Sequence, residues 1–329
     1  MSRYSAEEAA VVPKKWDANE IPSLHQKIVI ITGGNAGIGF ETALELVRNG
    51  ATVVLACRNE VRGLQAVVEL EQKLEYVPEA GKAVFMKLDV SDLSSVQAFA
   101  TAFHESYDRL DLLINNAGIF GIPYMETADG LEMQMATNHL GHFALTAQLF
   151  DLLLKSADAR VVTVSSMGHR GAKYNEDDII MTRENYDLSH AYTTSKLANL
   201  LFTFELTRRL GDHGIRNVKG VACHPGTTAT KIMQDSIEKS KWYHRLEFSL
   251  IRSLPIFQST SMGALPTLYA ATAPTVKSGQ FFGPGGFGGF GGYPALEDPS
   301  KQSKSVSAAR KLWVASERLT NTRFALTPP

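Results

Sequence analysis

The sequence predicts a doubly wound α/β domain, in which one parallel sheet of about seven strands carries helices on both faces. Three observations indicate this fold. Short β-branched runs alternate with longer helical patterns, a glycine-rich turn follows the first run directly, and hydroxyl and amide side chains recur where later runs end. We therefore expect one domain over residues 24–329, preceded by a loose arm over residues 1–23.

The expected strands are short apolar runs, and helical patterns fill the intervals between them. The strands cover Lys27–Thr32, Thr52–Cys57, Ala83–Leu88, Leu110–Asn115, Arg160–Ser165, Val218–Cys223 and, more weakly, Gly279–Phe282. The clearest helical patterns are Leu93–Tyr107, Leu131–Ser156 and Leu188–Leu210. This alternation is the pattern of a parallel sheet with crossover helices.

Two segments interrupt the alternation. Residues 228–255 mix basic and aromatic side chains, which we interpret as a lid over a substrate cleft; a patch lying on lipid and an ordinary amphipathic helix are the alternatives. Residues 283–293 read GPGGFGGFGGY, and so many glycines cost too much backbone entropy for a helix or a regular strand. We expect a mobile loop there, anchored by its aromatic rings.

Composition excludes several function classes. The formal net charge is −1, from 33 basic and 34 acidic residues, so no bulk field favours nucleic acid or an anionic membrane. The two cysteines, Cys57 and Cys223, belong to no metal-ligand cluster, so we expect no metal and a reducing compartment. No apolar run approaches the roughly 18 residues of a membrane helix. We therefore expect a cytoplasmic protein without a transmembrane anchor.

The glycine-rich turn is typical of a dinucleotide-binding site. Gly33 allows a sharp bend, Gly37 removes a side chain where a pyrophosphate approaches the backbone, and Gly39 allows the next helix to pack on its strand. That helix, roughly Ile38 to Asn49, directs its free N–H groups and the positive end of its dipole at the anion. A plain strand–turn–helix is the alternative, since it also uses glycine.

A tyrosine and a lysine lie four positions apart in the helical pattern that begins at Leu188. Tyr192 and Lys196 therefore share one helix face. A nearby ammonium favours the phenolate, and moving a tyrosine pKa from about 10 to near neutrality corresponds to about 4 kcal/mol. The pair suits general acid–base catalysis, whereas a chance pairing on a surface helix is the alternative.

Polar residues close three of the expected strands. Ser165-Ser166 follows the fifth strand, Asn115-Asn116-Ala117-Gly118 the fourth, and His224-Pro225-Gly226-Thr227-Thr228 the sixth. Each motif alone is explained by turn chemistry. Their joint occurrence at successive carboxyl ends, where open α/β sheets bind ligands, indicates a site.

Taken together, these motifs resemble the short-chain dehydrogenase/reductase superfamily, whose members have a Rossmann-type fold. The ordered set spans most of the chain. The retinol-dehydrogenase-like branch is indicated by Leu55–Asn59, Leu88–Ser91, Asn138–Phe143, Ser195–Asn199 and the interval of 26 positions from Ser166 to Tyr192. Members of that branch acting on membrane lipids often carry a hydrophobic N-terminal anchor, and the absence of an apolar start here weakens the case for retinoids.

The resemblance implies a role for each catalytic residue. Tyr192 exchanges a proton with the substrate oxygen, and Ser166 orients and polarises that oxygen. Lys196 binds the nicotinamide ribose and lowers the pKa of Tyr192. Asn138 maintains a helix irregularity and a water that relays the proton to solvent. The nicotinamide supplies the hydride.

The end of the second strand favours NADP(H) over NAD(H). Cys57 occupies the position where an acid would accept bonds from the NAD ribose, and Arg58 follows, which can pair with a 2′-phosphate. The resemblance places Asp89 and Val90 beside the adenine. The expected cofactor-binding residues are Gly33, Asn35, Gly37, Ile38, Gly39, Arg58, Asp89, Val90, Asn116, Tyr192, Lys196, Thr227 and Thr228.

These observations predict an NADP(H)-dependent oxidoreductase that interconverts a carbonyl and an alcohol on a fairly apolar small molecule. Two alternatives stay open: an NADPH-binding, redox-sensing protein without turnover, and a reductase of an activated carbon–carbon double bond. The resemblance also suggests a homodimer, formed through the helices expected at Leu131–Ser156 and Leu188–Leu210.

Overall fold

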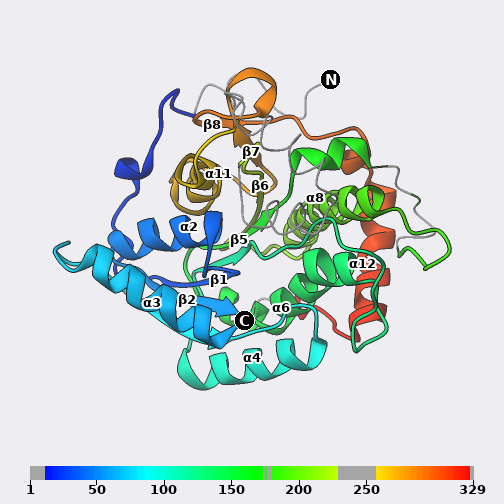
Figure 1. Cartoon of the computed structure of the whole chain (residues 1–329), viewed down its shortest axis with the longest axis horizontal. Helices are drawn as coiled ribbons and strands as arrows, with labels where there is room; N and C mark the ends of the chain where they lie inside the picture. Colours follow the sequence, from blue (N-terminus) through cyan, green and yellow to red (C-terminus); the bar gives the residue numbers. More distant parts are fainter. Residues whose placement is uncertain (1–11, 173–174, 176–179, 229–256, 327–329) are drawn as a thin grey trace, which may run out of the picture.

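The computed structural model describes residues 12–172, 175, 180–228 and 257–326. Its centre is an eight-stranded sheet in the order β3-β2-β1-β4-β5-β6-β7-β8 (Figure 1). The first seven strands pair in parallel, and β8 pairs with β7 in the antiparallel direction. The strands are β1 Ile28–Thr32, β2 Thr52–Cys57, β3 Lys82–Lys87, β4 Leu112–Asn115, β5 Ala159–Val164, β6 Val218–Cys223, β7 Phe281–Pro284 and β8 Pro294–Leu296.

All seven predicted strands are present, with small shifts at their ends, and the parallel α/β class is confirmed. The count of about seven was one strand short. The eighth strand, β8, has only three residues, so no alternation of apolar and polar side chains marks it in the sequence.

Helices cover both faces of the sheet (Figure 1). Along β1, Val29 and Ile31 face the core beneath α2, α3 and α11, whereas Ile30 faces the core beneath α4, α6 and α7. This alternation is what a strand buried on both faces requires. The helices are α2 Gly37–Arg48, α3 Glu60–Leu74, α4 Leu93–Ser106, α5 Met133–Met135, α6 Gly141–Gln148, α7 Phe150–Leu154, α8 Leu188–Asp212, α11 Thr260–Thr272 and α12 Val306–Thr320.

The strand order places a ligand crevice at the carboxyl ends of β1 and β4. From β1 the chain builds outward to β2 and β3, and then returns to form β4 on the other side of β1. The loops after β1 and β4 therefore lead away from each other and leave an opening between them. This is the position of the glycine-rich turn.

The single helix expected over Leu131–Ser156 is divided. It consists of α5, a π-helix η2 (Ala136–Leu140), α6 and α7. At the start of α6, Gly141 approaches the carbonyl of Val90 so closely that a Cβ there would lie 1.8 Å from the oxygen. Because nearly every residue of this stretch is apolar or buried, its periodicity does not reveal where the helical turns change.

The described part of the N-terminal arm is packed on the core and not loose as expected. Trp16 is 3% exposed, and its ring meets that of Tyr269 on α11 edge-on at 5.1 Å. Ile21 and Leu24 are buried in the same core, and the Leu24 N–H donates to the Asn49 carbonyl at 2.8 Å. Trp16 has polar neighbours in the sequence, and Tyr269 lies more than 200 positions away. The sequence pattern therefore does not predict this contact.

The C-terminal helix α12 packs along α8 and α6 (Figure 1). Trp313 is 1% exposed and contacts the rings of Phe143 and Phe202, while His139 of η2 hydrogen-bonds Ser316 at 2.9 Å. The resemblance suggests a homodimer through these same helices. A dimer formed there has to accommodate α12.

The glycine-rich segment connects β7 to β8. The N–H of Gly285 donates to the Tyr293 carbonyl and that of Gly286 to the Gly291 carbonyl, around a short 3-10 turn η4 (Phe287–Gly289). Phe287 is 95% exposed and so does not act as an anchor. Almost all of the expected lid, residues 229–255, lies outside the described residues. None of the helices that are described is long and apolar enough to span a bilayer.

We predict that Trp16→Ala lowers the free energy of unfolding by about 3 to 5 kcal/mol, the usual effect of deleting a buried tryptophan. Denaturant unfolding of the two proteins measures this. Trp16→Phe serves as the control, because it keeps a ring against Tyr269 and costs less. A change below about 0.5 kcal/mol for Trp16→Ala would mean that residues 12–24 are loose after all.

Candidate functional site

A cavity of about 350 Å³ opens at the carboxyl edge of the sheet, between β1 and β4. Most of the residues predicted to bind a cofactor line it: Gly33, Asn35, Gly37, Ile38, Gly39, Arg58, Asp89, Val90, Asn116, Tyr192 and Lys196. Ser166, Asn138, Thr227 and Thr228 lie outside its lining. The sequence motifs therefore meet in space, with the proposed acid–base pair and the glycine turn in one cavity.

The three glycines differ in backbone geometry and surroundings. Gly33 has a φ of +67°, a left-handed conformation that permits the sharp bend after β1. Gly37 has a φ of +56°, and a Cβ there would meet nothing within 4 Å, so its surface faces open space. A Cβ on Gly39 would lie 2.5 Å from the Gly33 carbonyl oxygen, which shows how closely α2 packs on the turn.

The N-terminus of α2 is suited to an anion. Its N-cap, Ala36, has no side-chain oxygen to satisfy the first N–H groups. Ala36, Gly37, Ile38 and Gly39 all line the cavity. Unpaired N–H groups and the positive end of the helix dipole therefore face the space where a pyrophosphate would lie.

The hydroxyl of Thr32 joins the ends of β1 and β4, a role that the sequence analysis missed. It accepts the N–H groups of Asn116 and Ala117, each at 2.9 Å, and contacts Nε2 of His142 at 2.8 Å. Burial lowers the pKa of His142 to about 3, so its ring is neutral and accepts the Thr32 proton. The Asn116 side chain donates to the Thr32 carbonyl at 2.8 Å, which fixes the loop after β4 against the glycine turn.

Tyr192 and Lys196 lie on one face of α8, as their spacing predicts. The Lys196 Nζ donates to the carbonyl of Val164, the last residue of β5, at 3.2 Å, and lies 5.8 Å from the centre of the Tyr192 ring. Ser166 is hydrogen-bonded to Tyr192 through its side chain. The geometry thus brings the predicted serine, tyrosine and lysine together.

The two serines after β5 have different environments. Ser165 is buried, and its hydroxyl donates to the Lys196 carbonyl at 2.7 Å. Ser166 caps the 3-10 turn η3 (Met167–Gly171): its Oγ accepts the Gly168 N–H at 3.1 Å. This contact uses a lone pair and not the Ser166 proton, so the hydroxyl can donate either to Tyr192 or to a ligand oxygen beside it. Ser165 lines the cavity and Ser166 does not, but the Ser165 proton is committed to the Lys196 carbonyl. The hydrogen bonding therefore favours Ser166 as the group that contacts a substrate oxygen.

The pKa of Tyr192 lies above its ordinary value, whereas the resemblance implies a value lowered by Lys196. Burial raises the pKa of Tyr192, and the hydrogen bond from Ser166 offsets only part of that effect. Burial also lowers the pKa of Lys196, to about 8. An ammonium 5.8 Å from the ring centre does not compensate for taking the phenolate out of water, so the phenol stays protonated at neutral pH.

Asn138 lies at the centre of the π-helix η2, where the sequence analysis expects a helix irregularity. Its Oδ1 accepts the Ile119 N–H at 2.8 Å, and its Nδ2 donates to the Ile119 carbonyl at 3.0 Å and to Ser195 Oγ at 2.9 Å. The side chain therefore fixes the loop after β4 to α8, one turn from Tyr192. The proton relay stays a prediction.

Two arginines lie at the other end of the cavity, near the end of β2. Arg58 is exposed, with its guanidinium 3.6 Å from the Asp89 carboxylate. Arg62, four residues on at the start of α3, lines the same cavity and was not predicted. The feature of the sequence that could have identified Arg62 is its spacing, four positions after Arg58. Cys57 is a buried thiol whose pKa burial raises to about 11, so the strand end itself carries no negative charge.

The two threonines after β6 are placed differently from the other predicted residues. The Thr227 N–H donates to the Phe290 carbonyl at 2.7 Å, so the glycine-rich segment contacts this loop. Thr228 is buried, and its hydroxyl donates to the Pro225 carbonyl at 3.0 Å. Among residues 224–228, the described part of this loop, only Pro225 lines the cavity.

The comparisons with known proteins agree with this geometry. Residues 27–241 match the family model for the short chain dehydrogenases. The chain is 39% identical to human retinol dehydrogenase 14 over 305 residues, 89% of this chain and 86% of that protein, and 39% identical to human WW domain-containing oxidoreductase over 305 residues, 91% and 69%. A crystal structure of an uncharacterized protein from Mycobacterium paratuberculosis aligns with a TM-score of 0.75 at 39% identity, covering 94% of this chain and 99% of that one. The chain therefore belongs to the short-chain dehydrogenase/reductase family of oxidoreductases, in its retinol-dehydrogenase-like branch.

Proposed function

We propose that this protein is an NADP(H)-dependent oxidoreductase that interconverts a carbonyl and an alcohol on a fairly apolar small molecule. One observation carries the proposal. Ser166, Tyr192 and Lys196 meet at one end of a site whose other end is formed by the glycine turn and two arginines. That arrangement suits proton transfer at a substrate oxygen beside a bound dinucleotide.

The residues present fit a nicotinamide dinucleotide. The open space over Gly37 and the side-chain-free N-terminus of α2 suit the pyrophosphate. Asp89, Val90, Asn116 and Lys196 all line the cavity. Asp89 and Val90 would contact the adenine, and Asn116 and Lys196 the riboses. When bound, the cofactor supplies or accepts the hydride.

The chain's own groups account for the proton. The Tyr192 phenol, protonated at neutral pH, donates its proton to the substrate oxygen in the reducing direction and becomes a phenolate. In the oxidising direction the phenolate accepts the proton of the substrate hydroxyl. The Ser166 hydroxyl, with one lone pair held by Gly168, donates a hydrogen bond to the same oxygen. The Lys196 Nζ uses one N–H for Val164, which leaves two for ribose hydroxyls.

The walls around Tyr192 favour an apolar substrate. Phe120 packs edge-on against the Tyr192 ring at 4.7 Å between centroids, and Ile119, Val164 and Pro225 line the same end of the cavity. Water is excluded from such a surface, which favours substrates with hydrocarbon next to the reacting oxygen. The relative named for retinol, an apolar alcohol, is in line with this choice.

We predict that Tyr192→Phe lowers kcat/KM by at least about 100-fold, because the phenol is the proton donor. The assay follows NADPH oxidation with a panel of apolar aldehydes and ketones. Tyr107→Phe, at the end of α4, is the matched control and retains activity. Wild-type turnover in Tyr192→Phe would show that Tyr192 is not the proton donor.

The same assay separates the two alternative functions. NADPH binding without turnover on any substrate would favour the redox-sensing protein, and a saturated ketone product would favour double-bond reduction.

We also predict that Arg58→Ala and Arg62→Ala each weaken NADPH binding by about tenfold, since each removes a charge-assisted contact to the 2′-phosphate. NADH binding changes little, because NADH lacks that phosphate. Fluorescence titration with both nucleotides measures the effect. Arg48→Ala on α2, outside the cavity, is the control. Equal losses for NADPH and NADH would show that the arginines do not distinguish the two cofactors.

A further inference from the structure

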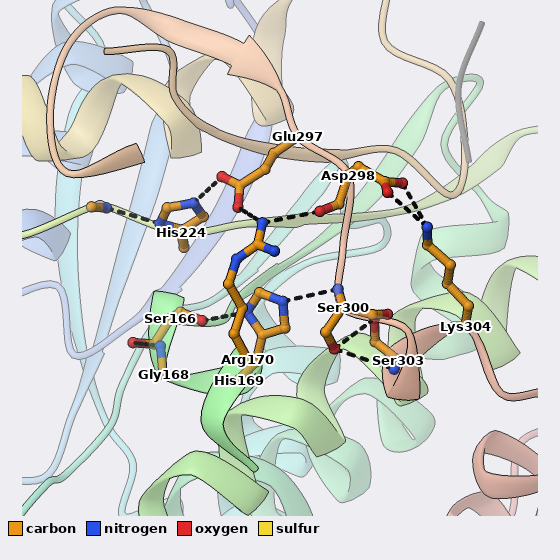
Figure 2. Close-up of polar contacts among 11 residues, drawn as sticks. Ser166, Gly168, His169, Arg170, His224, Glu297, Asp298, Ser300, Ser303 and Lys304 are labelled. Atoms are coloured by element: carbon orange, nitrogen blue, oxygen red, sulfur yellow. Dashed lines mark hydrogen bonds and ion pairs between the residues drawn. The ribbon is translucent and has the colours of Figure 1, made fainter. Parts of the chain in front are cut away.

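The segment after β8 contacts the turn that carries Ser166, although more than 100 residues separate them in the chain (Figure 2). Ser166 begins η3, and both His169 and Arg170 lie on that turn. The facing residues are Glu297 and Ser300, which follow β8. Neither of these two contacts follows from the sequence motifs.

His169 joins the Ser166 backbone to the segment after β8. Its Nδ1 donates to the Ser166 carbonyl at 2.6 Å, and its Nε2 accepts the Ser300 N–H at 3.2 Å. Because Ser300 is a donor, the ring must carry its proton on Nδ1. The ring is fully buried, and burial lowers its pKa to about 4, so this neutral form is the one present at physiological pH. The imidazole thus fixes the carbonyl of the residue whose hydroxyl contacts Tyr192.

Glu297 links the same turn to the end of β6. Its Oε1 accepts from Arg170 at 2.6 Å, and its Oε2 accepts from Nε2 of His224. His224 receives the Gly226 N–H at Nδ1, at 3.0 Å, so its other nitrogen must be the donor to Glu297. One carboxylate therefore joins the loops that follow β5 and β6, the two loops on either side of the reacting end of the cavity.

A glycine makes the contact between Glu297 and His224 possible. Gly283 of β7 lies between the two side chains, and a Cβ there would be 2.1 Å from the His224 Nε2 and 2.2 Å from the Glu297 carboxylate. β8, whose antiparallel pairing places Ala295 opposite Gly283, brings Glu297 into position. The β7–β8 pair thus extends the sheet and also positions Glu297 against His224.

The charges around Glu297 also favour its contacts with Arg170 and His224. Burial raises the pKa of Glu297, but the hydrogen bonds from His224 and Arg170 and the positive charge of Arg170 more than compensate and hold that pKa below its ordinary value. Arg170 also donates to the Asp298 carbonyl at 3.0 Å, and Lys304 pairs with the Asp298 carboxylate at 2.8 Å. The Glu297 carboxylate is thus ionised at neutral pH, with Arg170 hydrogen-bonded to one oxygen and His224 to the other.

We propose that Glu297 and His169 are positioning residues that hold the Ser166 hydroxyl against Tyr192 from the far side of η3. The inference rests on the proposed carbonyl–alcohol reaction, in which Ser166 contacts the substrate oxygen. Neither residue lines the cavity. Both act through the turn that Ser166 caps, because His169 contacts the Ser166 carbonyl and Glu297 contacts Arg170. Their loss lowers kcat by displacing the hydroxyl and leaves the nucleotide end of the site unchanged.

The test uses Glu297→Gln in the full chain, with Asp151→Asn as the matched control. Asp151 on α7 also pairs with a histidine, His104, at 2.9 Å, but its side chain is exposed and does not line the cavity. We expect Glu297→Gln to lower kcat by about 10- to 100-fold with unchanged affinity for NADPH, and Asp151→Asn to change neither. Equal kcat values in Glu297→Gln and wild type would overturn the proposal.

A double-mutant cycle separates positioning from general stability. In a Ser166→Ala background, Glu297→Gln has no further effect on kcat, because the hydroxyl that it positions is absent. Multiplicative losses in the double mutant would overturn the positioning role. Arg170→Lys, which keeps the charge but loses the planar contact, is a second variant and shows an intermediate loss.

Amide hydrogen exchange tests the geometry without any substrate. In Glu297→Gln the N–H groups of Gly168 and His169 exchange faster than in wild type, while those of α2 do not. Unchanged exchange at η3 would overturn the proposal whatever the activity. Faster exchange at η3 in a protein that turns over no carbonyl would instead support the positioning contact and reject the proposed function, so the two failures are distinguishable.

Discussion

The burial of one ammonium group, that of Lys196, is the constraint on which the site depends. Lys196 is 5% exposed, and its Nζ donates to the last carbonyl of β5, while its own carbonyl accepts the Ser165 hydroxyl. Asn199 donates to the same β5 carbonyl at 3.1 Å. A buried charge is tolerated only where hydrogen bonds compensate for lost hydration, so α8 has to lie against the end of β5. This contact determines where Tyr192 meets Ser166.

The same burial explains why the free protein holds its phenol protonated. The ammonium and the phenol are both removed from water, and each charged form is disfavoured for that reason. Tyr192 is therefore in its proton-donating form before the substrate binds. The loops around it are fixed by neutral groups, since His142 and His169 both have strongly lowered pKa values and serve as hydrogen-bonding links between segments.

Sequence analysis predicted the features that local spacing determines. The bend at Gly33, the shared helix face of Tyr192 and Lys196, and the parallel sheet all follow from short-range patterns. It missed features that depend on distant partners. Trp16 packs against Tyr269 of α11, which lies far away in the sequence, and no residue spacing marks the π-helix η2. Glu297 gained its place from an antiparallel strand too short to recognise.

The most direct test of the account is the pKa of Lys196 in the free protein, measured by amine labelling across pH with mass spectrometry. This measurement needs no substrate and no cofactor. The account predicts a titration midpoint near 8, because the ammonium is buried beside Tyr192 at the end of β5. A midpoint near the ordinary lysine value of about 10.4 would contradict it, since the amine would then be hydrated and α8 would not be held against β5 in this way.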